Sequence, residues 1–227
     1  MQTIATATLP DTVQRPQYDR HSLRSRIVHF GFGAFHRAHQ ALLTDRVLNA
    51  KGGDWGICEI SLFSGDRLMA QLREQDHLYT VLEKGAAGNE ARIIGVVNEC
   101  LNAKLDTLAA IIEKFCEPQV AIVSLTITEK GYCIDPATGK LDLSQPRIAH
   151  DLEHPTEPHS APGILVEALS RRRERGLPAF TVLSCDNIPD NGHVVKHAVL
   201  GMAQTRSAEL AEWINQHVRF PSTMVDR

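Results

Sequence analysis

The sequence has no surplus of positive charge. Its 24 Lys and Arg residues are outnumbered by 27 Asp and Glu residues, which gives a formal net charge of −3. The only dense basic cluster lies within residues 171–175. Because proteins bind nucleic acid by neutralising its phosphates with clustered Lys and Arg, we expect no nucleic-acid partner.

Long apolar runs are also missing. The longest run that looks buried, residues 120–128, is about half of the ~18 residues that a membrane-spanning helix needs. Residues 1–26 contain no uninterrupted apolar stretch of the kind found in signal peptides. We therefore expect no membrane contact and no export.

Cysteine is scarce and scattered. The five cysteines are odd in number, and no two of them form a Cys-x-x-Cys pair. This pattern disfavours both a disulfide framework and a cysteine zinc site. The simplest interpretation is a set of reduced thiols in the core of a cytoplasmic protein. The five are Cys58, Cys100, Cys116, Cys133 and Cys185.

The length of 227 residues suits one large domain, or one domain with an appendage, at about 150 residues per domain. Residues 1–24 are polar and contain Pro10 and Pro16, so they are predicted to be an extended lead-in. The folded domain is expected to occupy residues 25–227. No internal repeat and no low-complexity tract is present in the sequence.

Strands and helices are predicted to alternate along this domain. Because parallel strands need crossover connections and helices usually supply them, the alternation predicts a Rossmann-like, doubly wound α/β fold with a mainly parallel sheet. Gly176 and Pro178 mark the end of one helix. Strands are expected at 27–30, 55–62, 78–82, 93–97, 120–126 and 180–185. Helices are expected from the turn after 33 toward 48 and at 66–75, 105–116, 163–175, 194–204 and 208–217, with an irregular excursion holding a short helix at 145–162 and an extended piece at 220–225.

The motif Gly31-Phe-Gly33-Ala-Phe-His36 follows the first expected strand and opens the first expected helix. A dinucleotide fingerprint occupies this place: the first glycine makes a tight turn, and the second lets the backbone approach the pyrophosphate at the helix N-terminus. The third glycine of that fingerprint is replaced here by His36. The alternative interpretation is a tight strand-to-helix turn with no ligand.

An acidic side chain beyond the next strand would accept hydrogen bonds from the cofactor ribose. Glu59 lies within the expected strand, and Asp66 lies just beyond its end. Asp66 is the better placed of the two. A carboxylate there would repel the 2′-phosphate of NADP, so NAD is favoured, although Arg67 leaves NADP open.

His36 and His39 stand three residues apart on the first expected helix and could bind a metal from one face. A tetrahedral site needs three or four protein ligands, and the sequence supplies no further ordered set nearby. We therefore predict no metal, and a contact of one imidazole with the cofactor phosphates. A metal hydrolase built on these two histidines is the rival hypothesis.

Polar residues follow two later strands. In open α/β sheets ligands bind outside the carboxyl ends of the strands, so Thr126, Thr128 and Glu129 could line the nicotinamide end of a cleft. The alternative is that the threonines are ordinary strand residues and that Glu129 is solvated. Asn187, after the strand at 180–185, is either an ordinary turn residue or a hydrogen-bond donor to a substrate oxygen.

Four motifs together resemble the polyol-specific long-chain dehydrogenases, the mannitol dehydrogenase family. They are Gly-Phe-Gly-Ala-Phe-His-Arg-Ala-His-Gln (31–40), Ser-Leu-Thr-Ile-Thr-Glu-Lys-Gly-Tyr (124–132), Ser-Cys-Asp-Asn (184–187) and Phe-Pro-x-x-Met-Val-Asp-Arg (220–227). Within the family, Thr-Glu-Lys-Gly-Tyr is most similar to the bacterial D-mannonate oxidoreductases, also called fructuronate reductases. Mannitol 2-dehydrogenases tend to carry Thr-Glu-Gly-Gly-Tyr.

The resemblance implies zinc-independent hydride transfer between NAD and a small sugar acid or polyol. It implies that Asn187 polarises the reacting oxygen and that Asp226 lies on the substrate side of the cleft. It also implies a general-base lysine in a Lys-x4-Asn-x2-His pattern within a helical C-terminal domain, and these 227 residues contain no such pattern. We therefore expect the NAD-binding half of an oxidoreductase, inactive by itself. The residues expected around the cofactor are Gly31, Gly33, Phe35, His36, Arg37, Asp66, Thr126, Thr128 and Glu129.

Two alternatives to a fructuronate reductase remain open at this point. One is a mannitol dehydrogenase or another polyol 2-dehydrogenase. The other is a non-catalytic dinucleotide-binding module, which the missing lysine pattern favours. The sequence gives no indication of the oligomeric state.

Overall fold

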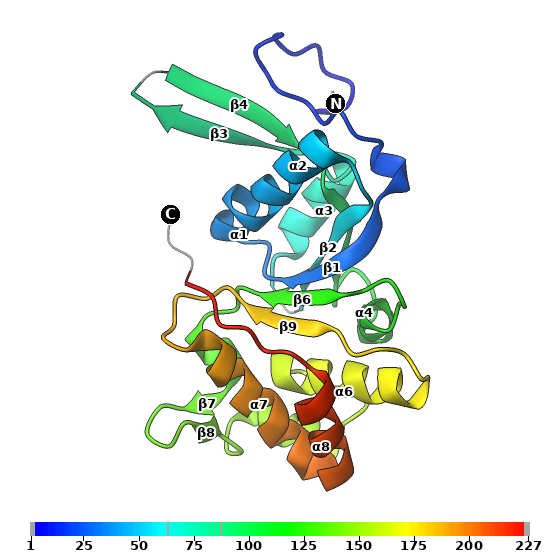
Figure 1. Ribbon diagram of the computed structural model, residues 1–227, viewed down its shortest axis with the longest axis vertical. Helices are drawn as coiled ribbons and strands as arrows, with labels where there is room; N and C mark the ends of the chain where they lie inside the picture. The colour runs from blue at the N-terminus through cyan, green and yellow to red at the C-terminus, as the bar shows by residue number, and fades with distance from the viewer. Residues whose placement is uncertain (1–2, 63, 87, 225–227) are drawn as a thin grey trace. The chain divides into compact units, whose positions relative to one another are not determined.

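The computed structural model describes residues 3–62, 64–86 and 88–224. The chain divides into two compact units, Met1–Asp106 and Thr107–Arg227. Figure 1 follows the chain from the first unit, which begins in blue, to the second, which ends in red.

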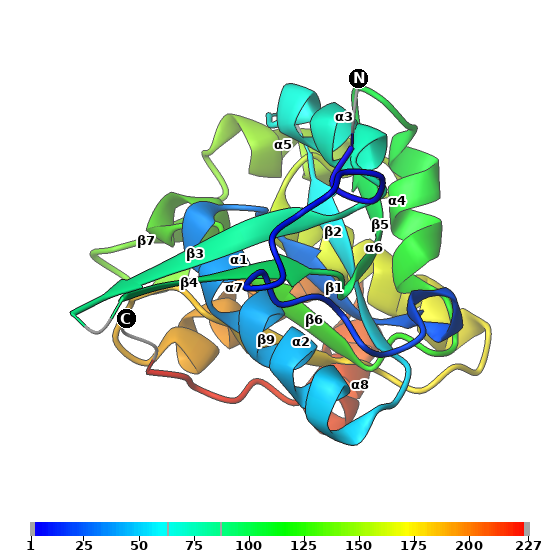
Figure 2. The ribbon, with the colours of Figure 1, turned by 90° about the horizontal axis from the view of Figure 1, so that it is seen from above.

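The first unit contains a parallel three-stranded sheet. Its strands are β1 (Arg24–Phe30), β2 (Trp55–Ser61) and β5 (Val97–Asn102), in the order β5-β2-β1. Two helices, α2 (Gln40–Lys51) and α3 (Asp66–Glu74), lie on opposite faces of β1 and β2, as Figure 2 shows. Because each parallel pair needs a crossover, these helices supply the connections.

An antiparallel hairpin interrupts the alternation in the first unit. Its strands are β3 (Tyr79–Gly85) and β4 (Gly88–Ile94). The sequence predicted short strands at 78–82 and 93–97, so both boundaries were wrong and β5 was not foreseen. The charged residues Glu83, Lys84 and Glu90 gave this segment the sequence pattern of a loop. The hairpin tolerates them because neither of its faces is fully buried. The expected strand at 93–97 joined the end of β4 to the start of β5.

The lead-in contains one 3₁₀ turn, η1 (Arg20–Ser22), among its described residues, and it is held firmly against the first unit. Gln14 forms an isolated bridge with Arg92. The hydroxyl of Tyr18 donates to Oδ1 of Asp45, which is fully buried, at 2.5 Å. The lead-in contains turns at residues 4–6 and 11–12 as well as η1, and it packs as part of the unit.

The second unit contains the parallel pair β6 (Ile122–Leu125) and β9 (Thr181–Ser184). Helix α6 (Ala161–Glu174) is buried over most of its length, and Gly176 follows it at φ +65°, as the stop signals predicted. The expected excursion contains a short helix, α5 (Pro146–Glu153). The other elements are α4 (Leu108–Phe115), η2 (Glu129–Tyr132), β7 (Ile134–Asp135), β8 (Lys140–Leu141), α7 (Asn191–Arg206) and α8 (Ala208–His217).

All five cysteines are buried, as expected for core thiols. None of the helices formed by the described residues combines the length and the apolarity needed to cross a bilayer.

Candidate functional site

A glycine turn (residues 31–33) follows the carboxyl end of β1. Gly31 has φ 106°, a region that favours glycine, and its carbonyl accepts a hydrogen bond of 2.7 Å from the amide of Gly33. A Cβ placed on Gly33 would meet no atom closer than 3.9 Å. Packing within the protein therefore does not require glycine at position 33, whereas close approach of a ligand to the backbone would.

The helix after this turn is broken. A short helix, α1 (Ala34–Ala38), ends at His39, which has φ −122° and ψ −90°, and α2 begins at Gln40. The prediction of one helix running toward residue 48 was wrong here. The apolar spacing of Phe35, Ala38 and Leu42 continues across the break, so periodicity could not reveal it. The ring of Phe35, about a third exposed, stacks on that of His39 at 5.2 Å.

A histidine–glutamate cluster (His29, His36 and Glu59) lies beneath the glycine turn, and each of the three residues is at most 1% exposed. His29 on β1 and Glu59 on β2 are register partners, and the rings of His29 and His36 stack with centroids 3.4 Å apart. Nε2 of His36 lies 2.7 Å from Oε1 of Glu59. Nε2 of His29 donates to the carbonyl of Gly31 at 3.1 Å.

Burial controls the protonation of this cluster. Desolvation raises the pKa of Glu59 to about 7, and it lowers the pKa of His29 and of His36 to about 3. Below pH 7 the contact between His36 and Glu59 is therefore a hydrogen bond between neutral groups rather than an ion pair. His36 carries no positive charge near neutral pH in this state, so it cannot act as a cation toward phosphates, although its part in cofactor binding stays a prediction.

The same three side chains are the one group of potential metal ligands that the described part of the chain brings together. Their geometry does not suit a metal. In a tetrahedral zinc site with bonds of about 2.0–2.1 Å, the ligand atoms stand about 3.3 Å apart and point at a common centre. Here the 2.7 Å contact is a hydrogen-bond distance, and the two stacked rings, inclined by 11°, direct their nitrogens along parallel planes.

Arg37 and Asp66 stand at the surface of the first unit. Nε of Arg37 donates to the carbonyl of Gly33 at 3.3 Å, so this guanidinium lies along the glycine turn. Asp66 is the first residue of α3, and its carboxylate lies 3.0 Å from Nζ of Lys104, a contact that lowers its pKa. Its side chain is 43% exposed, so it can still reach a ligand.

The second unit gathers its predicted residues around one carboxylate that the sequence did not single out. Asp186, just after β9, accepts hydrogen bonds from the amides of Ile127 and Thr128 at 3.1 and 3.0 Å and from the hydroxyl of Tyr132 at 2.6 Å. Thr128 has φ 65° and ψ 164°, a strained conformation for a β-branched residue. Asp186 therefore fixes the loop that carries Thr126, Thr128 and Glu129.

A second set of contacts fixes the extended segment that leads toward Asp226. The side chain of Asn191 donates to the carbonyl of Asp186 and to that of Thr223, both at 3.0 Å. The hydroxyl of Thr223 donates to the carbonyl of Ser184 at 2.7 Å. Asn187 is exposed on the loop between these contacts. Asp226 itself lies outside the described residues, so its predicted role stays a prediction.

Sequence reasoning missed Asp186 and Asn191 because Asn, Asp and Gly after a strand are ordinary turn residues. The only local signal was the strand–loop position of the Ser-Cys-Asp-Asn motif. The contacts that give Asp186 its importance join residues 58 and 59 positions apart in the chain.

Asp186→Asn is expected to lower the free energy of unfolding by about 1–3 kcal/mol, because either orientation of the amide turns its NH₂ group toward a backbone N–H. The Thr128 amide should then exchange with solvent faster. Asp190→Asn is the matched control: Asp190 makes no capping hydrogen bond, so its effect should stay within about 0.5 kcal/mol. Urea unfolding and hydrogen exchange measure both, and equal effects of the two substitutions would contradict the role of Asp186.

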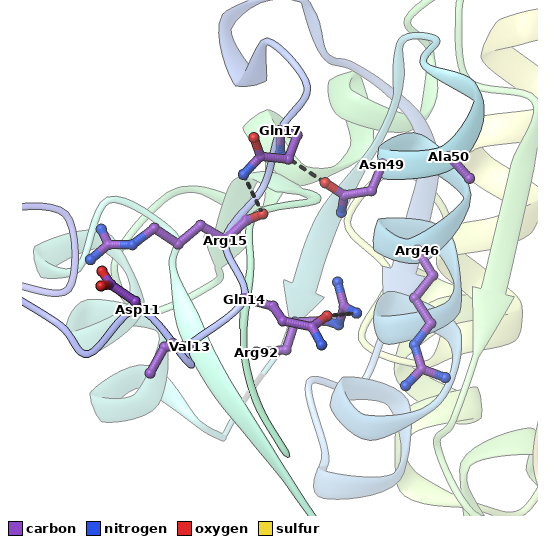
Figure 3. A pocket seen from close by; sticks show the side chains of 9 residues that line it. All are labelled: Asp11, Val13, Gln14, Arg15, Gln17, Arg46, Asn49, Ala50 and Arg92. Atoms are coloured by element: carbon purple, nitrogen blue, oxygen red, sulfur yellow. Dashed lines mark hydrogen bonds between the residues drawn. The ribbon is translucent and has the colours of Figure 1, made fainter.

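A pocket of about 690 Å³ in the first unit is lined by the lead-in, α2 and β4. Figure 3 shows Arg92 and Gln14 between Arg15 on one side and Arg46 on the other. Arg46 hydrogen-bonds Glu83, and Arg92 hydrogen-bonds Gln14. We therefore interpret this pocket as part of the packing of the lead-in and place the candidate site at the glycine turn.

The chain matches the family described as "Mannitol dehydrogenase Rossmann domain" over residues 25–227. It is 81% identical over 227 residues to the uncharacterized oxidoreductase YeiQ of Escherichia coli (strain K12), and 56% identical over 229 residues to the D-mannonate oxidoreductase of that organism. Both alignments cover 100% of this chain, but 46% and 47% of the two relatives. The chain spans about half the length of the curated relatives it matches.

Two solved structures are similar over almost the whole chain. One is the Pseudomonas fluorescens mannitol 2-dehydrogenase in a ternary complex with NAD and D-mannitol, at TM-score 0.92 and 46% identity, covering 96% of this chain and 45% of that one. The other is a substrate-free D-sorbitol dehydrogenase, at TM-score 0.92 and 39% identity, covering 100% of this chain and 47% of that one. These similarities confirm the predicted Rossmann-like fold.

Proposed function

The chain belongs to the mannitol dehydrogenase family, as its motifs predicted, and from this premise we propose that it is the NAD-binding part of an oxidoreductase acting on a CH–OH group. The proposed reaction is hydride transfer between NAD(H) and a sugar acid, and it interconverts D-mannonate and D-fructuronate. The observation that carries the proposal is the glycine turn at the end of β1, where Gly33 leaves room that the protein's own packing does not use.

The residues around the glycine turn have chemistry that suits NAD. The turn offers backbone at close range to a pyrophosphate, and Arg37 lies along it as a cation. Asp66 is an exposed carboxylate that suits ribose hydroxyls and repels a 2′-phosphate. NAD is therefore the proposed cofactor, and when bound it would supply or accept the hydride.

A sugar acid is favoured over a neutral polyol by two observations. The identity to the D-mannonate oxidoreductase is 56%, against 46% to a mannitol 2-dehydrogenase of Cereibacter sphaeroides. Lys130, in the loop that Asp186 fixes, is an exposed cation, and a sugar acid has a carboxylate for such a cation to recognise. A polyol dehydrogenase is the alternative, and comparison of D-fructuronate with D-fructose as substrates of the whole enzyme distinguishes the two.

The chain's own residues have separate parts in the proposed mechanism. The amide of Asn187, exposed on its loop, would donate a hydrogen bond to the oxygen on which charge develops. Asp186 would keep that loop and the Thr128 loop in place. The proton would come from a lysine outside these 227 residues. We also propose a cytoplasmic location, because five free thiols suit a reducing compartment.

Calorimetric titration of the chain with NADH and with NADPH tests the cofactor proposal. NADH should bind more tightly than NADPH by about tenfold, equivalent to about 1.4 kcal/mol. Asp66→Ala should reduce this ratio to about threefold or less, because it removes both the ribose hydrogen bond and the repulsion of the 2′-phosphate. Glu74→Ala, at the other end of α3, should leave the ratio unchanged. Equal affinity of the unmutated chain for both cofactors would contradict the role of Asp66.

A further inference from the structure

The carbonyl of Gly31 is held from two sides. It accepts the amide of Gly33 at 2.7 Å and Nε2 of His29 at 3.1 Å, so the histidine–glutamate cluster is bonded directly to the backbone of the glycine turn. His36 belongs to α1, which follows the same turn, and it hydrogen-bonds Glu59. A change at Glu59 therefore reaches the turn by two routes, through α1 and through the stacked ring of His29.

The cluster is not satisfied as an ordinary core network would be. Oε2 of Glu59 is buried and has no hydrogen-bond partner among the residues that the structure describes. Buried polar groups in stable cores are almost always paired, because an unpaired one costs free energy. A carboxyl kept in this state next to a ligand-binding turn indicates a role beyond stability.

We propose that Glu59 is a positioning residue for the cofactor: the histidine–glutamate cluster holds the Gly31 carbonyl, and binding of the anionic dinucleotide shifts the Glu59 carboxylate toward its protonated form, with the proton taken from solvent. This inference rests on the proposed function, since it requires NAD(H) at the glycine turn. It adds that the affinity for the cofactor depends on the protonation of a residue that does not touch the cofactor.

The groups that face the Glu59 carboxyl come from four elements: His29 on β1, His36 and Arg37 on α1, Tyr79 on β3 and Cys100 on β5. Burial lowers the pKa of both histidines to about 3 and raises the pKa of Tyr79 and of Cys100 above their ordinary values. The Arg37 guanidinium is a cation throughout. Glu59, with its pKa raised by burial to about 7, is therefore the member of this group that changes charge between pH 6 and 8.5.

The sign of the coupling follows from charge. The pyrophosphate brings negative charge to the turn, and an ionised Glu59 beneath it repels that charge. Binding therefore raises the pKa of Glu59 further, and the protein with the neutral carboxyl binds more tightly. Affinity should be highest below pH 7 and should fall as the pH rises through and above 7.

The first test uses the unmutated chain. NADH binding is measured by calorimetry between pH 5.5 and 8.5, in pairs of buffers with different ionisation enthalpies. If binding raises the pKa of Glu59 by one unit, about half a proton is taken up near pH 7.5 and almost none near pH 5.5. The dissociation constant should then be about five- to tenfold larger at pH 8.5 than at pH 6. Binding without proton uptake at any pH would overturn the inference and leave the cofactor proposal standing.

The second test removes the titration without removing the hydrogen bond. Glu59→Gln should bind NADH at pH 6 within about twofold of the unmutated chain and should lose the pH dependence, because the amide does not titrate. Glu74→Gln, an exposed carboxyl of the same unit, should keep it. A pH dependence that survives in Glu59→Gln would overturn the inference. Absence of NADH binding to the unmutated chain at every pH would overturn it together with the proposed cofactor.

Discussion

The 227-residue chain by itself is expected to reduce D-fructuronate with NADH about 10⁴-fold more slowly than an intact member of the family, or slower still. Positioned acid–base catalysis contributes about 10²- to 10⁴-fold, and these residues contain no Lys-x4-Asn-x2-His pattern. Loss of substrate positioning multiplies that deficit. Tyr132 cannot replace the lysine, because its hydroxyl is bonded to Ser184 and Asp186 and burial raises its pKa.

A chimera supplies the control for this prediction. The chain joined to the remaining half of the E. coli D-mannonate oxidoreductase, a relative 56% identical over the shared part, should regain turnover. Asn187→Ala in that chimera should lower kcat by about 10²-fold or more, because it removes a hydrogen bond to the developing charge. The turnover of the unjoined chain, the chimera and the Asn187→Ala chimera is measured as the rate of NADH consumption. Turnover by the unjoined chain at the rate of an intact enzyme would contradict both the placement of the base and the claim that this chain is only the NAD-binding part of the enzyme.

Arg172→Ala is expected to have the largest effect on stability, about 3–5 kcal/mol. Arg172 on α6 is fully buried, and its guanidinium lies 5.5 Å from the ring centre of Phe180. Alanine at position 172 would leave an empty space and four buried carbonyls without their present partner. The Arg172 guanidinium donates to the backbone carbonyls of Pro178, Phe115, Glu117 and Val120, at 2.7, 2.8, 2.9 and 3.3 Å.

The neighbouring Arg173 provides the matched control. Its side chain is 38% exposed and lies 3.8 Å from Glu209, so Arg173→Ala should cost about 1 kcal/mol or less. Urea unfolding followed by the fluorescence of Trp213 in a Trp55→Phe background reports the second unit. Because a whole domain is stable by only about 5–15 kcal/mol, the Arg172 variant should unfold at a clearly lower urea concentration. Similar midpoints for the two variants would show that the buried guanidinium is not needed.

The features that the sequence predicted correctly depend on few neighbouring residues. Gly176 ends α6 in the left-handed region because the cap is specified by that residue and the turn before it. The turn at Gly31 and Gly33 was likewise encoded locally. The apolar spacing of 163–175 was enough to place α6 within two residues of its observed start.

The features that the sequence did not predict depend on pairing between distant segments. Glu59 meets His36 because β1 and β2 align His29 with Glu59, and no pattern in the single sequence specifies that register. Asp186 gains its role from amides 58 and 59 positions earlier in the chain. The roles predicted for Asp66, Asn187 and Glu129 in binding or catalysis stay predictions, because they are contacts with a bound ligand and not contacts within the protein.

An NMR titration of the ¹⁵N-labelled chain with NADH tests the central claim most directly, because it reports both binding and its place. We expect saturable shifts of the Gly31, Gly33 and Phe35 amides at the glycine turn. Shifts confined to the pocket lined by Arg15 and Arg92, or no shifts at millimolar NADH, would contradict the claim that this chain binds NAD(H) at the end of β1.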